Sequence, residues 1–359
     1  MTKQTIGILT GGGDCPGLNA AIRAIAKTAV HDYGWELIGI NDGYEGLING
    51  KARQLLFSDV SNILSLGGTI LGTSNKANPF AYCEKGKEPA DVSDRVIENL
   101  EKWKIDTLFC IGGDGTLSVA NRLLKKWPRI IGVPKTIDND LKATDQTFGF
   151  DTACNFVTEA LDRIHSTAQS HHRVMVIEVM GRYAGWIALE GGVAGGGDVI
   201  LIPEIPFSFD KVTEVVNTRS KKGKRFSIVV VAEGARPEGG EYAVREYVKD
   251  SPDPIRLGGI GAIVADHIEK TTGHESRATA LGHLQRGGCP SFFDRILASQ
   301  YGAAAVELAA KNIYGKMIAL RGNAMVYADL EEATSGLKLV TPDHPLVKTA
   351  LSLGTSFGA

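Results

Sequence analysis

The most constraining feature of the sequence is a unit that recurs along most of the chain. A short apolar run rich in β-branched residues is followed by a glycine-rich turn, and then by a stretch with apolar residues at helical spacing. The first example is TIGILT (5–10), GGGDCPG, and a segment in which Leu18, Ile22 and Ile25 share one helical face and Pro16 suits the first turn. Wholly apolar strands are typical of parallel sheets covered by helices. The pattern therefore predicts an α/β fold with mostly parallel sheets.

The same reading assigns strands and helices to most of the chain. Further strands are expected at 37–40, 105–113, 129–134, 173–181, 226–235 and 276–282. Further helices are expected at 117–127, about 151–170, 183–196, 260–273 and 294–311. We expect two α/β units with a boundary near residue 150, and we interpret the Pro-, Gly- and charge-rich segment 236–259 as a surface excursion.

Composition excludes several classes of protein. A net charge of −2 gives no general attraction to nucleic acid or to a membrane surface. No apolar run reaches the ~18 residues of a membrane helix, and the first residues have no signal-peptide layout. The five cysteines are widely spaced and form no CxxC pair, so we expect neither a disulfide scaffold nor a zinc site, and a cytoplasmic location is favoured.

The first glycine-rich turn, TGGGDCPG (10–17), joins a strand to a helix start. Free N–H groups and the helix dipole favour an anion there, and glycines allow a phosphate to approach the backbone. The spacing of Gly11, Gly13 and Gly17 does not fit a dinucleotide fingerprint, and no GxxxxGK[ST] loop occurs in the chain. The turn therefore predicts a phosphate site of another class, although a plain tight turn would have the same composition.

Two later turns add carboxylates to the same context. IGGDGT (111–116) contains Asp114, and a carboxylate among phosphate-binding glycines requires a cation, for which Mg²⁺ is the natural candidate. Similar runs occur in lipid kinases and NAD kinases, and Asp114 also suits a helix start.

GVPKTIDNDL (132–141) places Asp138 and Asp140 two residues apart. One of these could lie near an acceptor hydroxyl, while the other holds metal or orients the first. The turns predict a phosphoryl-transfer enzyme.

Arginines and polar groups occupy the later turns. Arg173, Arg182, Arg277 and Arg286 all lie near predicted strand ends. A guanidinium matches phosphate geometry, and Glu233 can accept hydrogen bonds from sugar hydroxyls. For one arginine alone a solvated surface role is the commoner case, but four of them beside acidic glycine-rich turns favour a phosphorylated substrate.

Six segments occur in a characteristic order: GGGDCPGLNAAIR, GGDGT, PKTIDND, VMGRYAGW, LGHLQRGG and DRILAS. Over nearly its whole length the chain resembles the 6-phosphofructokinase family, and TIDND with MGR and HxQRGG separates it from NAD and lipid kinases. The resemblance implies two doubly wound, mostly parallel-sheet domains. It implies that 1–149 with about 285–335 form a larger domain for ATP and Mg²⁺. About 150–284 with 336–359 then form a smaller domain for fructose 6-phosphate.

The resemblance also implies the reaction and the roles of individual residues. The γ-phosphoryl group of ATP passes to the 1-hydroxyl of D-fructose 6-phosphate, giving fructose 1,6-bisphosphate and ADP in glycolysis. Asp138 takes the hydroxyl proton, Thr136 helps to hold the transferring group, and Asp140 orients the base or binds metal. Asp114 holds Mg²⁺, and Arg182 stabilises the transition-state charge.

Binding residues follow from the same comparison. Those expected to contact fructose 6-phosphate, besides Thr136, Asp138 and Arg182, are Ile137, Met180, Gly181, Glu233, His283, Leu284, Gln285 and Arg286. Arg173 and Arg277 are expected to reach the sugar phosphate across a subunit interface, which implies a homo-oligomer, usually a tetramer. Those expected to line ATP, besides Asp114, are Gly13, Tyr44, Lys76, Ala77, Gly113, Gly115 and Thr116.

Two positions bear on the phosphoryl donor. Pyrophosphate users of the family have Asp after GGD and Lys before TIDND, whereas typical bacterial ATP users have Gly at both; this chain has Gly115 and Lys135. An Asp at 115 would place bulk and negative charge where the α-phosphate of a nucleotide must lie, so the glycine favours ATP. A pyrophosphate-dependent phosphotransferase remains the alternative. A non-enzymatic sensor is disfavoured, since a sensor has no need of a base beside the acceptor.

Overall fold

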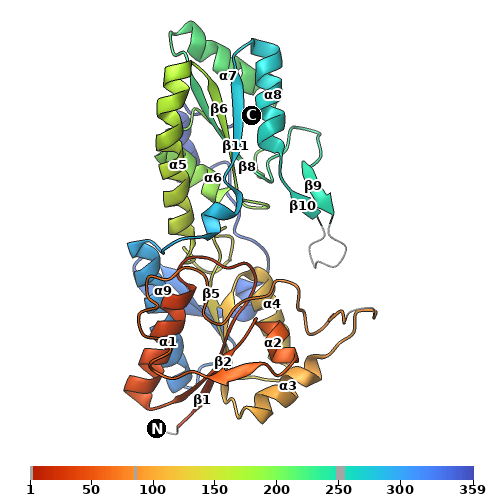
Figure 1. Ribbon diagram of the computed structural model, residues 1–359, viewed down its shortest axis with the longest axis vertical. Coiled ribbons are helices and arrows are strands. Elements are labelled where there is room, and N and C mark those ends of the chain that lie inside the picture. Colours follow the sequence, from red (N-terminus) through yellow and green to blue (C-terminus); the bar gives the residue numbers. More distant parts are fainter. Residues whose placement is uncertain (1–2, 85–86, 248–254) are drawn as a thin grey trace. The chain divides into compact units, whose positions relative to one another are not determined.

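The computed structural model describes residues 3–84, 87–247 and 255–359 (Figure 1). They form two compact units. Unit 1 comprises residues up to Asp151 together with Arg286–Leu337, and unit 2 comprises 152–247, 255–285 and 338–359. In the described part of the chain, no helix combines the length and the apolar character needed to cross a membrane.

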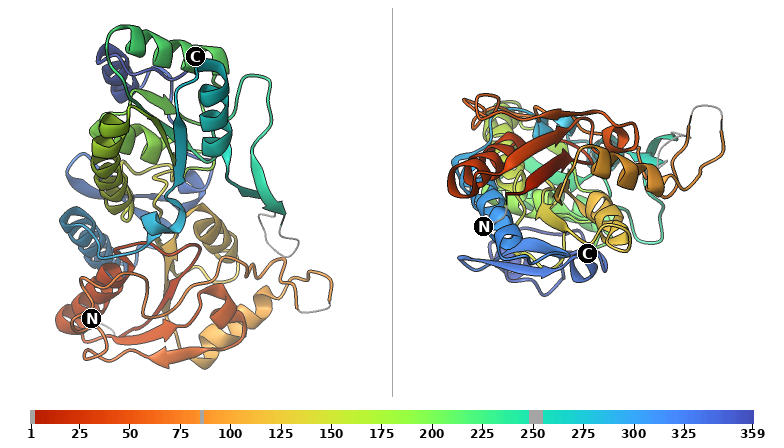
Figure 2. Two further views of the ribbon diagram at one scale, coloured as in Figure 1. Left: turned by 45° about the horizontal axis from the view of Figure 1, so that its top comes forward. Right: turned by 90° about the horizontal axis from the view of Figure 1, so that it is seen from below.

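Unit 1 is built on a seven-stranded sheet. Its strands are β1 Thr5–Thr10, β2 Glu36–Ile40, β3 Ala52–Gln54, β4 Thr107–Gly112, β5 Ile130–Pro134, β12 Lys316–Arg321 and β13 Ala324–Asp329. Its helices are α1 Leu18–Tyr33, α2 Tyr44–Ile48, α3 Ser93–Lys102, α4 Asp114–Leu123, α9 Phe292–Ala310 and α10 Leu330–Ala333. Helices α1 and α9 cover one face of the sheet, and α2, α3 and α4 cover the other (Figures 1 and 2).

The strand order of this sheet determines where a ligand can bind. The order is β13-β12-β5-β4-β1-β2-β3, and all pairs from β12 to β2 are parallel. The chain runs from β1 to β2 on one side and later returns to β4 on the other, so β1 and β4 flank the point at which the strand order reverses. Ligands of open α/β sheets bind beyond the carboxyl ends of the strands at such a point.

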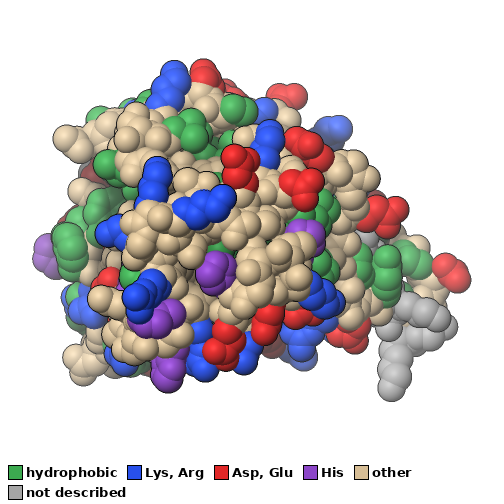
Figure 3. Space-filling model, turned by 90° about the horizontal axis from the view of Figure 1, so that it is seen from above, with side chains coloured by type: hydrophobic (Ala, Val, Ile, Leu, Met, Phe, Trp, Pro, Cys, Tyr) green, Lys and Arg blue, Asp and Glu red, His purple; other side chains and the backbone are tan. Residues whose placement is uncertain are grey.

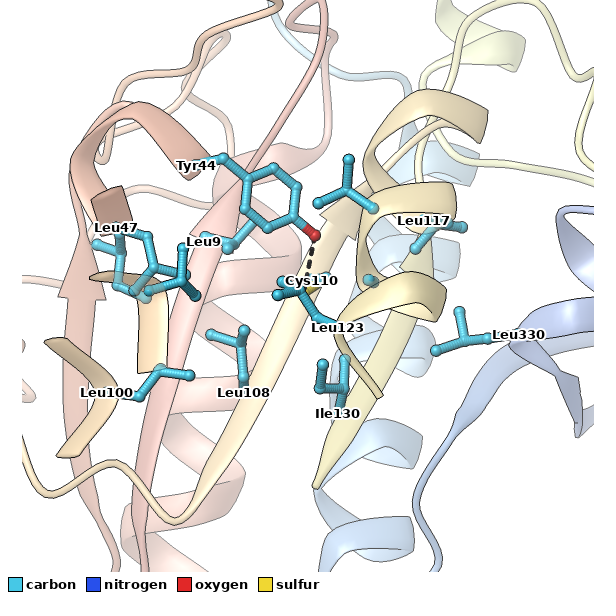
Figure 4. Packing of buried hydrophobic residues seen from close by; sticks show 14 of the residues in the cluster. Leu9, Tyr44, Leu47, Leu100, Leu108, Cys110, Leu117, Leu123, Ile130 and Leu330 are labelled. Atoms are coloured by element: carbon cyan, nitrogen blue, oxygen red, sulfur yellow. Dashed lines mark hydrogen bonds between the residues drawn. The ribbon is translucent and has the colours of Figure 1, made fainter. Parts of the chain in front are cut away.

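The core on the α2–α4 face explains why these apolar runs form strands. Leu9, Leu108 and Ile130 come from three neighbouring strands, and Leu117 and Leu123 cover them from α4 (Figure 4). All five are fully buried. At ~2 kcal/mol for each large side chain removed from water, this contact fixes α4 on the sheet and therefore fixes the turn that precedes α4.

Unit 2 is built on a four-stranded parallel sheet of order β11-β6-β8-β7. Its strands are β6 Val174–Val179, β7 Val199–Leu201, β8 Ser227–Ala232 and β11 Ser276–Ala280, and a separate antiparallel pair is formed by β9 Val244–Tyr247 and β10 Ile255–Leu257. Its helices are α5 Phe150–His171, α6 Trp186–Ala194, α7 Phe209–Lys221, α8 Ile260–Thr272, the 3₁₀ helix η1 Gly282–Arg286 and α11 Pro345–Ser352. Helix α5 begins in unit 1, and η1 ends there, at Arg286.

The expected fold class is confirmed, with three corrections of detail. Helix α1 begins at Leu18 after a left-handed Gly17, so Pro16 precedes the helix instead of lying in its first turn. The sheet of unit 1 has antiparallel edges at β2–β3 and β12–β13, because these connections are short turns without a crossover helix. Several elements were not predicted: helices α2, α3, α7, α10 and α11, and strands β3, β7, β9, β10, β12 and β13. Within the segment 236–259, all four residues of β9 are exposed, and 248–254 lie outside the described residues.

Candidate active site

Three turns of unit 1 follow neighbouring strands of the sheet. The first glycine-rich turn follows β1, the turn containing Asp114 follows β4, and the turn containing Asp138 and Asp140 follows β5. Because the strands are parallel, the three turns lie at the same edge of the sheet, at the reversal between β1 and β4. The sheet therefore brings together the three segments that were separated by up to 130 residues in the sequence.

Packing around Thr116 explains two of the glycines. A Cβ atom added at Gly11 would lie 2.5 Å from the Thr116 hydroxyl, and one added at Gly112 would lie 2.3 Å from the Thr116 Cβ. The Gly11 N–H also donates to the Ile111 carbonyl at 2.9 Å. Gly11 is thus required by the close approach of the first turn to the second, and Gly112 by the packing of Thr116 back onto the end of β4 within the second turn. Gly115, in contrast, is exposed and has no atom within 4 Å of an added Cβ.

Two cationic side chains attach to the first turn. The buried Lys135 ammonium donates to the Gly13 carbonyl at 2.5 Å, and the Arg286 guanidinium donates to the Asp14 carbonyl at 3.1 Å. Burial lowers the pKa of Lys135. An added Cβ at Gly13 would lie 2.6 Å from Arg286, so this glycine leaves room for the guanidinium. Sequence reasoning placed Lys135 and Arg286 on substrates, but it did not foresee that both hold the first turn.

The three carboxylates of the site all have raised pKa values. Burial raises the pKa of Asp114 and of Asp138, and the charges of Arg286 and Lys135 oppose the rise at Asp138. Burial also raises the pKa of Asp140 to about 7, and the charges of Asp138 and Asp114 add to the rise. Locally, Thr136 accepts from the Asp138 N–H at 3.0 Å, which fixes the turn between them. The site therefore brings three carboxylates together where burial disfavours their charged forms, and a cation beside them would offset that cost.

This concentration of charge fits a divalent cation. In the described residues no group of three His, Cys, Asp or Glu side chains converges as a closed metal site. Magnesium in phosphoryl-transfer enzymes does not need such a cage, because it keeps several waters and takes one or two carboxylates together with substrate phosphates. Asp114 is half-buried at the start of α4, which leaves its carboxylate accessible to such an ion.

Two helix starts of unit 1 suit an anion. Helices α1 and α4 have glycine N-caps, Gly17 and Gly113, which offer no side chain to the first N–H groups. Helix α9, in contrast, is capped by the Ser291 side chain. The two glycine-capped helix starts, with their positive dipole ends, suit the linked phosphates of a nucleotide or of pyrophosphate.

Tyr44 and Lys76 differ in their surroundings. Tyr44 is 4% exposed in the core, and its hydroxyl donates to the Thr116 carbonyl at 2.9 Å and to Cys110 (Figure 4). Its hydroxyl supports the second turn from within the core, and its ring is not exposed to solvent. Lys76 is exposed, and the loop that carries it with Ala77 is joined to Gly12, whose N–H donates to the Ser74 carbonyl at 3.1 Å.

In unit 2 the predicted sugar-phosphate residues form a second group of turns. Met180, Gly181 and Arg182 follow β6, and Glu233 follows the neighbouring strand β8. The Gly234 N–H donates to the Gly181 carbonyl at 3.0 Å, which joins the two turns. The Gln285 side chain accepts from the Met180 N–H at 3.2 Å, and this adds η1 to the group. His283 and Leu284 are exposed on η1, whereas Gln285 is buried.

Two helix starts of unit 2 are already occupied by carboxylates. Glu204 accepts from Gly185 at the start of α6, at 3.0 and 3.1 Å. Glu178 accepts from Gly259 at 3.0 Å and from Gly261 at 2.8 Å at the start of α8. Sequence reasoning missed both, although Glu178 carries a signal, because it is the one charged residue in an otherwise apolar strand. A carboxylate at each of these two starts disfavours a substrate phosphate there, which leaves side chains to bind it.

Arg173 and Arg277 lie at the other end of this sheet. Arg173 precedes β6 and Arg277 is the second residue of β11, whereas Arg182 and Glu233 follow their strands. A six-residue strand separates the two ends by ~20 Å. Both arginines bind Glu275, at 2.9 and 2.5 Å. In Figure 3, lysine, arginine and histidine side chains lie on the surface with acidic side chains among them. The structure thus separates Arg173 and Arg277 from the other sugar-phosphate candidates of the same chain.

The sequence of this chain matches one known protein family over most of its length. The family model described as phosphofructokinase matches residues 5–309. The chain belongs to the phosphofructokinase family. It is 56% identical over 359 residues to the ATP-dependent 6-phosphofructokinase 2 of Clostridium perfringens, covering 99% of this chain and 98% of the relative.

Other members of the phosphofructokinase family carry a different donor in their names. The chain is 50% identical over 339 residues to the pyrophosphate–fructose 6-phosphate 1-phosphotransferase of Amycolatopsis methanolica, covering 94% of this chain and 97% of the relative. Among solved structures, the phosphofructokinase of Saccharomyces cerevisiae matches with a TM-score of 0.80 and 32% identity over 93% of this chain, which spans 45% of the yeast chain. Membership of the phosphofructokinase family therefore leaves the donor to be argued from the site.

Proposed function

We propose that this chain is an ATP-dependent 6-phosphofructokinase, which transfers the γ-phosphoryl group of ATP to the 1-hydroxyl of fructose 6-phosphate with Mg²⁺. The observation that carries the proposal is the meeting of three carboxylate-bearing and glycine-rich turns at the reversal point of the unit 1 sheet, beside two open helix starts. Charged phosphates need both features, namely N–H groups for their oxygens and carboxylates for their metal.

The two units take different substrates in this proposal. Unit 1 binds ATP, because the starts of α1 and α4 have glycine caps without a side chain and its first two turns present backbone N–H groups. Unit 2 binds fructose 6-phosphate, because Glu204 and Glu178 place carboxylates at the starts of α6 and α8, and a single phosphate is then left to arginine and histidine side chains. Glu233, beside Arg182, supplies an acceptor for sugar hydroxyls.

The chemical step centres on Asp138. Its carboxylate takes the proton of the 1-hydroxyl as the sugar oxygen forms a bond to the γ-phosphorus and the bond to the ADP oxygen breaks. The raised pKa of Asp138 makes it a better base near neutral pH than an ordinary aspartate. Thr136 holds the transferring group, Asp140 orients Asp138, and Arg182 stabilises the charge that spreads over the phosphoryl oxygens. Bound through Asp114, Mg²⁺ supplies charge neutralisation of the donor phosphates.

The donor assignment rests on Gly115. Its position in the first turn of α4 is exposed, and an added side chain would meet no protein atom within 4 Å. The space is therefore available to a nucleotide. Lys135 donates to the Gly13 carbonyl, which engages its ammonium within the protein and weakens the argument that it is reserved for pyrophosphate.

A panel of donors tests the proposal. Purified enzyme with fructose 6-phosphate and Mg²⁺ would be supplied with ATP, ADP or pyrophosphate, and fructose 1,6-bisphosphate would be measured. We expect kcat/KM for ATP to exceed that for pyrophosphate by at least about tenfold, equivalent to ~1.4 kcal/mol of transition-state binding. Activity with pyrophosphate alone would establish the second candidate, which the Amycolatopsis relative and Lys135 favour.

We further propose a homo-oligomer in which Arg173 and Arg277 complete the sugar-phosphate site of a second copy. The support is their position at the amino ends of β6 and β11, about a strand length from Arg182. A two-fold interface gives each copy the same exchange of residues, and a tetramer can contain two such pairs.

Mixing two inactive variants tests this assembly. We expect R277A and D138N each to be nearly inactive, and an equal mixture that has exchanged subunits to recover about a quarter of the wild-type activity, because half of the sites in each hybrid pair are intact. Native mass spectrometry confirms that hybrids form. Hybrids without activity would rule out the shared site.

A further inference from the structure

The segment 337–340 carries the chain from unit 1 into unit 2 and is anchored in each. In unit 1, Leu337 forms a β-bridge with Leu141, the residue that directly follows Asp140. Leu141 is fully buried, so the bridge attaches the crossing segment to the base of the acidic turn. The next residue, Lys338, already belongs to unit 2.

In unit 2 the crossing segment is held at the start of α6. The Trp186 indole N–H donates to the Lys338 carbonyl at 2.8 Å, and the Val340 N–H donates to the Glu204 carboxylate at 2.9 Å. Val340 is buried, and the Trp186 ring also packs edge-on against His344 at 5.0 Å. The segment therefore has two hydrogen bonds and one buried apolar side chain at this end.

Glu204 joins this anchor to the turn that carries Arg182. The same carboxylate accepts from the Gly185 N–H, three residues after Arg182. Gly185 packs closely on Ile202, because an added Cβ there would lie 2.4 Å from the Ile202 Cβ. Burial raises the pKa of Glu204, and its backbone hydrogen bonds oppose that rise. One carboxylate thus fixes the arginine turn and the crossing segment relative to each other inside unit 2.

We propose that Glu204 is a positioning residue. It holds the Arg182 turn on the segment 337–340, which is bridged to Leu141 directly after the acidic turn, so that the two turns are mechanically linked through 337–340. The inference rests on the proposed function, because it assigns a consequence for phosphoryl transfer. It goes beyond that function in naming residues outside every substrate-binding turn. Trp186 is the second member of the link.

A matched carboxylate separates this role from simple support of the fold. Asp198 lies in the same unit, its pKa is also raised by burial, and it accepts a backbone N–H, that of Ile228, at 2.9 Å. It precedes β7, at the end of the sheet away from Arg182. D198N therefore removes a buried carboxylate, together with its ion pair to Arg219 at 2.7 Å, without touching the crossing segment.

Steady-state kinetics give the first test. In E204Q an amide oxygen in place of Oε1 can still accept from both Gly185 and Val340, but the NH₂ group then replaces Oε2, faces the Gly185 N–H and removes the negative charge, so the anchor is weakened. We expect kcat to fall by about tenfold or more, since small misplacements of a charge-stabilising group are costly, and the half-saturating fructose 6-phosphate concentration to change less. W186F should act in the same direction with a smaller effect. D198N should stay within about twofold of wild type, since its site lies apart from the link.

Hydrogen–deuterium exchange gives a second test that does not depend on activity. In E204Q we expect faster exchange in peptides covering 180–186 and 336–341, and also in 138–142, where the Leu141 bridge would be loosened. D198N should leave all three unchanged. Unchanged exchange at 138–142, or a kcat loss in D198N equal to that in E204Q, would overturn the proposal. An inactive wild type would instead refute the proposed function, and the exchange result would still decide the mechanical link.

Discussion

Replacing Asp138 with Asn is expected to lower kcat by about three orders of magnitude or more, with the half-saturating fructose 6-phosphate concentration changed only a few fold. The amide occupies the same space beside Thr136 but cannot take the proton of the 1-hydroxyl. A loss in kcat without a loss in binding is the signature of an interaction made only in the transition state. The measurement is initial rate against substrate concentration at saturating donor.

The stability of D138N provides its control. Burial raises the pKa of Asp138 in the folded chain, so its ionised form costs stability. This cost is absent below the unfolded pKa of ~3.9 and grows as the pH rises through the folded value. Without ligands, D138N should therefore have a Tm at least equal to that of wild type at pH 8, with no advantage at pH 4. Wild-type turnover in a well-folded D138N would contradict the role of Asp138 as base.

The second large effect is expected at the donor site. Replacing Gly115 with Asp should lower kcat/KM for ATP by about a hundredfold or more, because a carboxylate would then face the nucleotide phosphates across the open start of α4. The position is exposed, its φ is not in the left-handed region, and an added Cβ meets nothing within 4 Å. The Tm should accordingly stay within about 2 °C of wild type, as for most surface substitutions.

Two comparisons sharpen this experiment. G115S adds a side chain of similar reach without charge, so it separates bulk from repulsion. Pyrophosphate has no α-phosphate beside a ribose, and its use should fall less than that of ATP in G115D. Equal losses with both donors would mean that position 115 does not discriminate between them, and the argument for ATP would then lose its physical basis.

The sequence predicted the fold wherever period and turn chemistry agree. β1, β4 and β6 are almost wholly buried and mainly apolar runs that lead into glycine-containing turns, and such runs have one stable environment, the middle of a parallel sheet. The hairpin β12–β13 was missed because its exposed residues break the apolar pattern and its turn is short. Helix α7 was missed because only Val212 and Val216 are buried in it, too few to establish a period by eye.

The site was predicted in part, for a physical reason. Asp114, Asp138 and Asp140 could be singled out because carboxylates in phosphate-binding turns are locally anomalous. The attachment of Lys135 and Arg286 to the first turn could not be foreseen, because it depends on contacts across more than 100 residues. Glu204 lies in a turn between prolines, where an acidic residue is ordinary, and only its hydrogen bonds reveal a role.

The packing of Thr116 against Gly11 and Gly112 has a consequence for how homologous sequences should be read. Both positions exclude a methyl group because of a neighbouring side chain, whether or not phosphate is bound. Selection for folding alone would therefore keep them as glycine, even in a descendant that had lost catalysis. Gly115 has no such constraint, so its retention or loss across a lineage would report on the donor, and the three glycines carry evolutionary information of two different kinds.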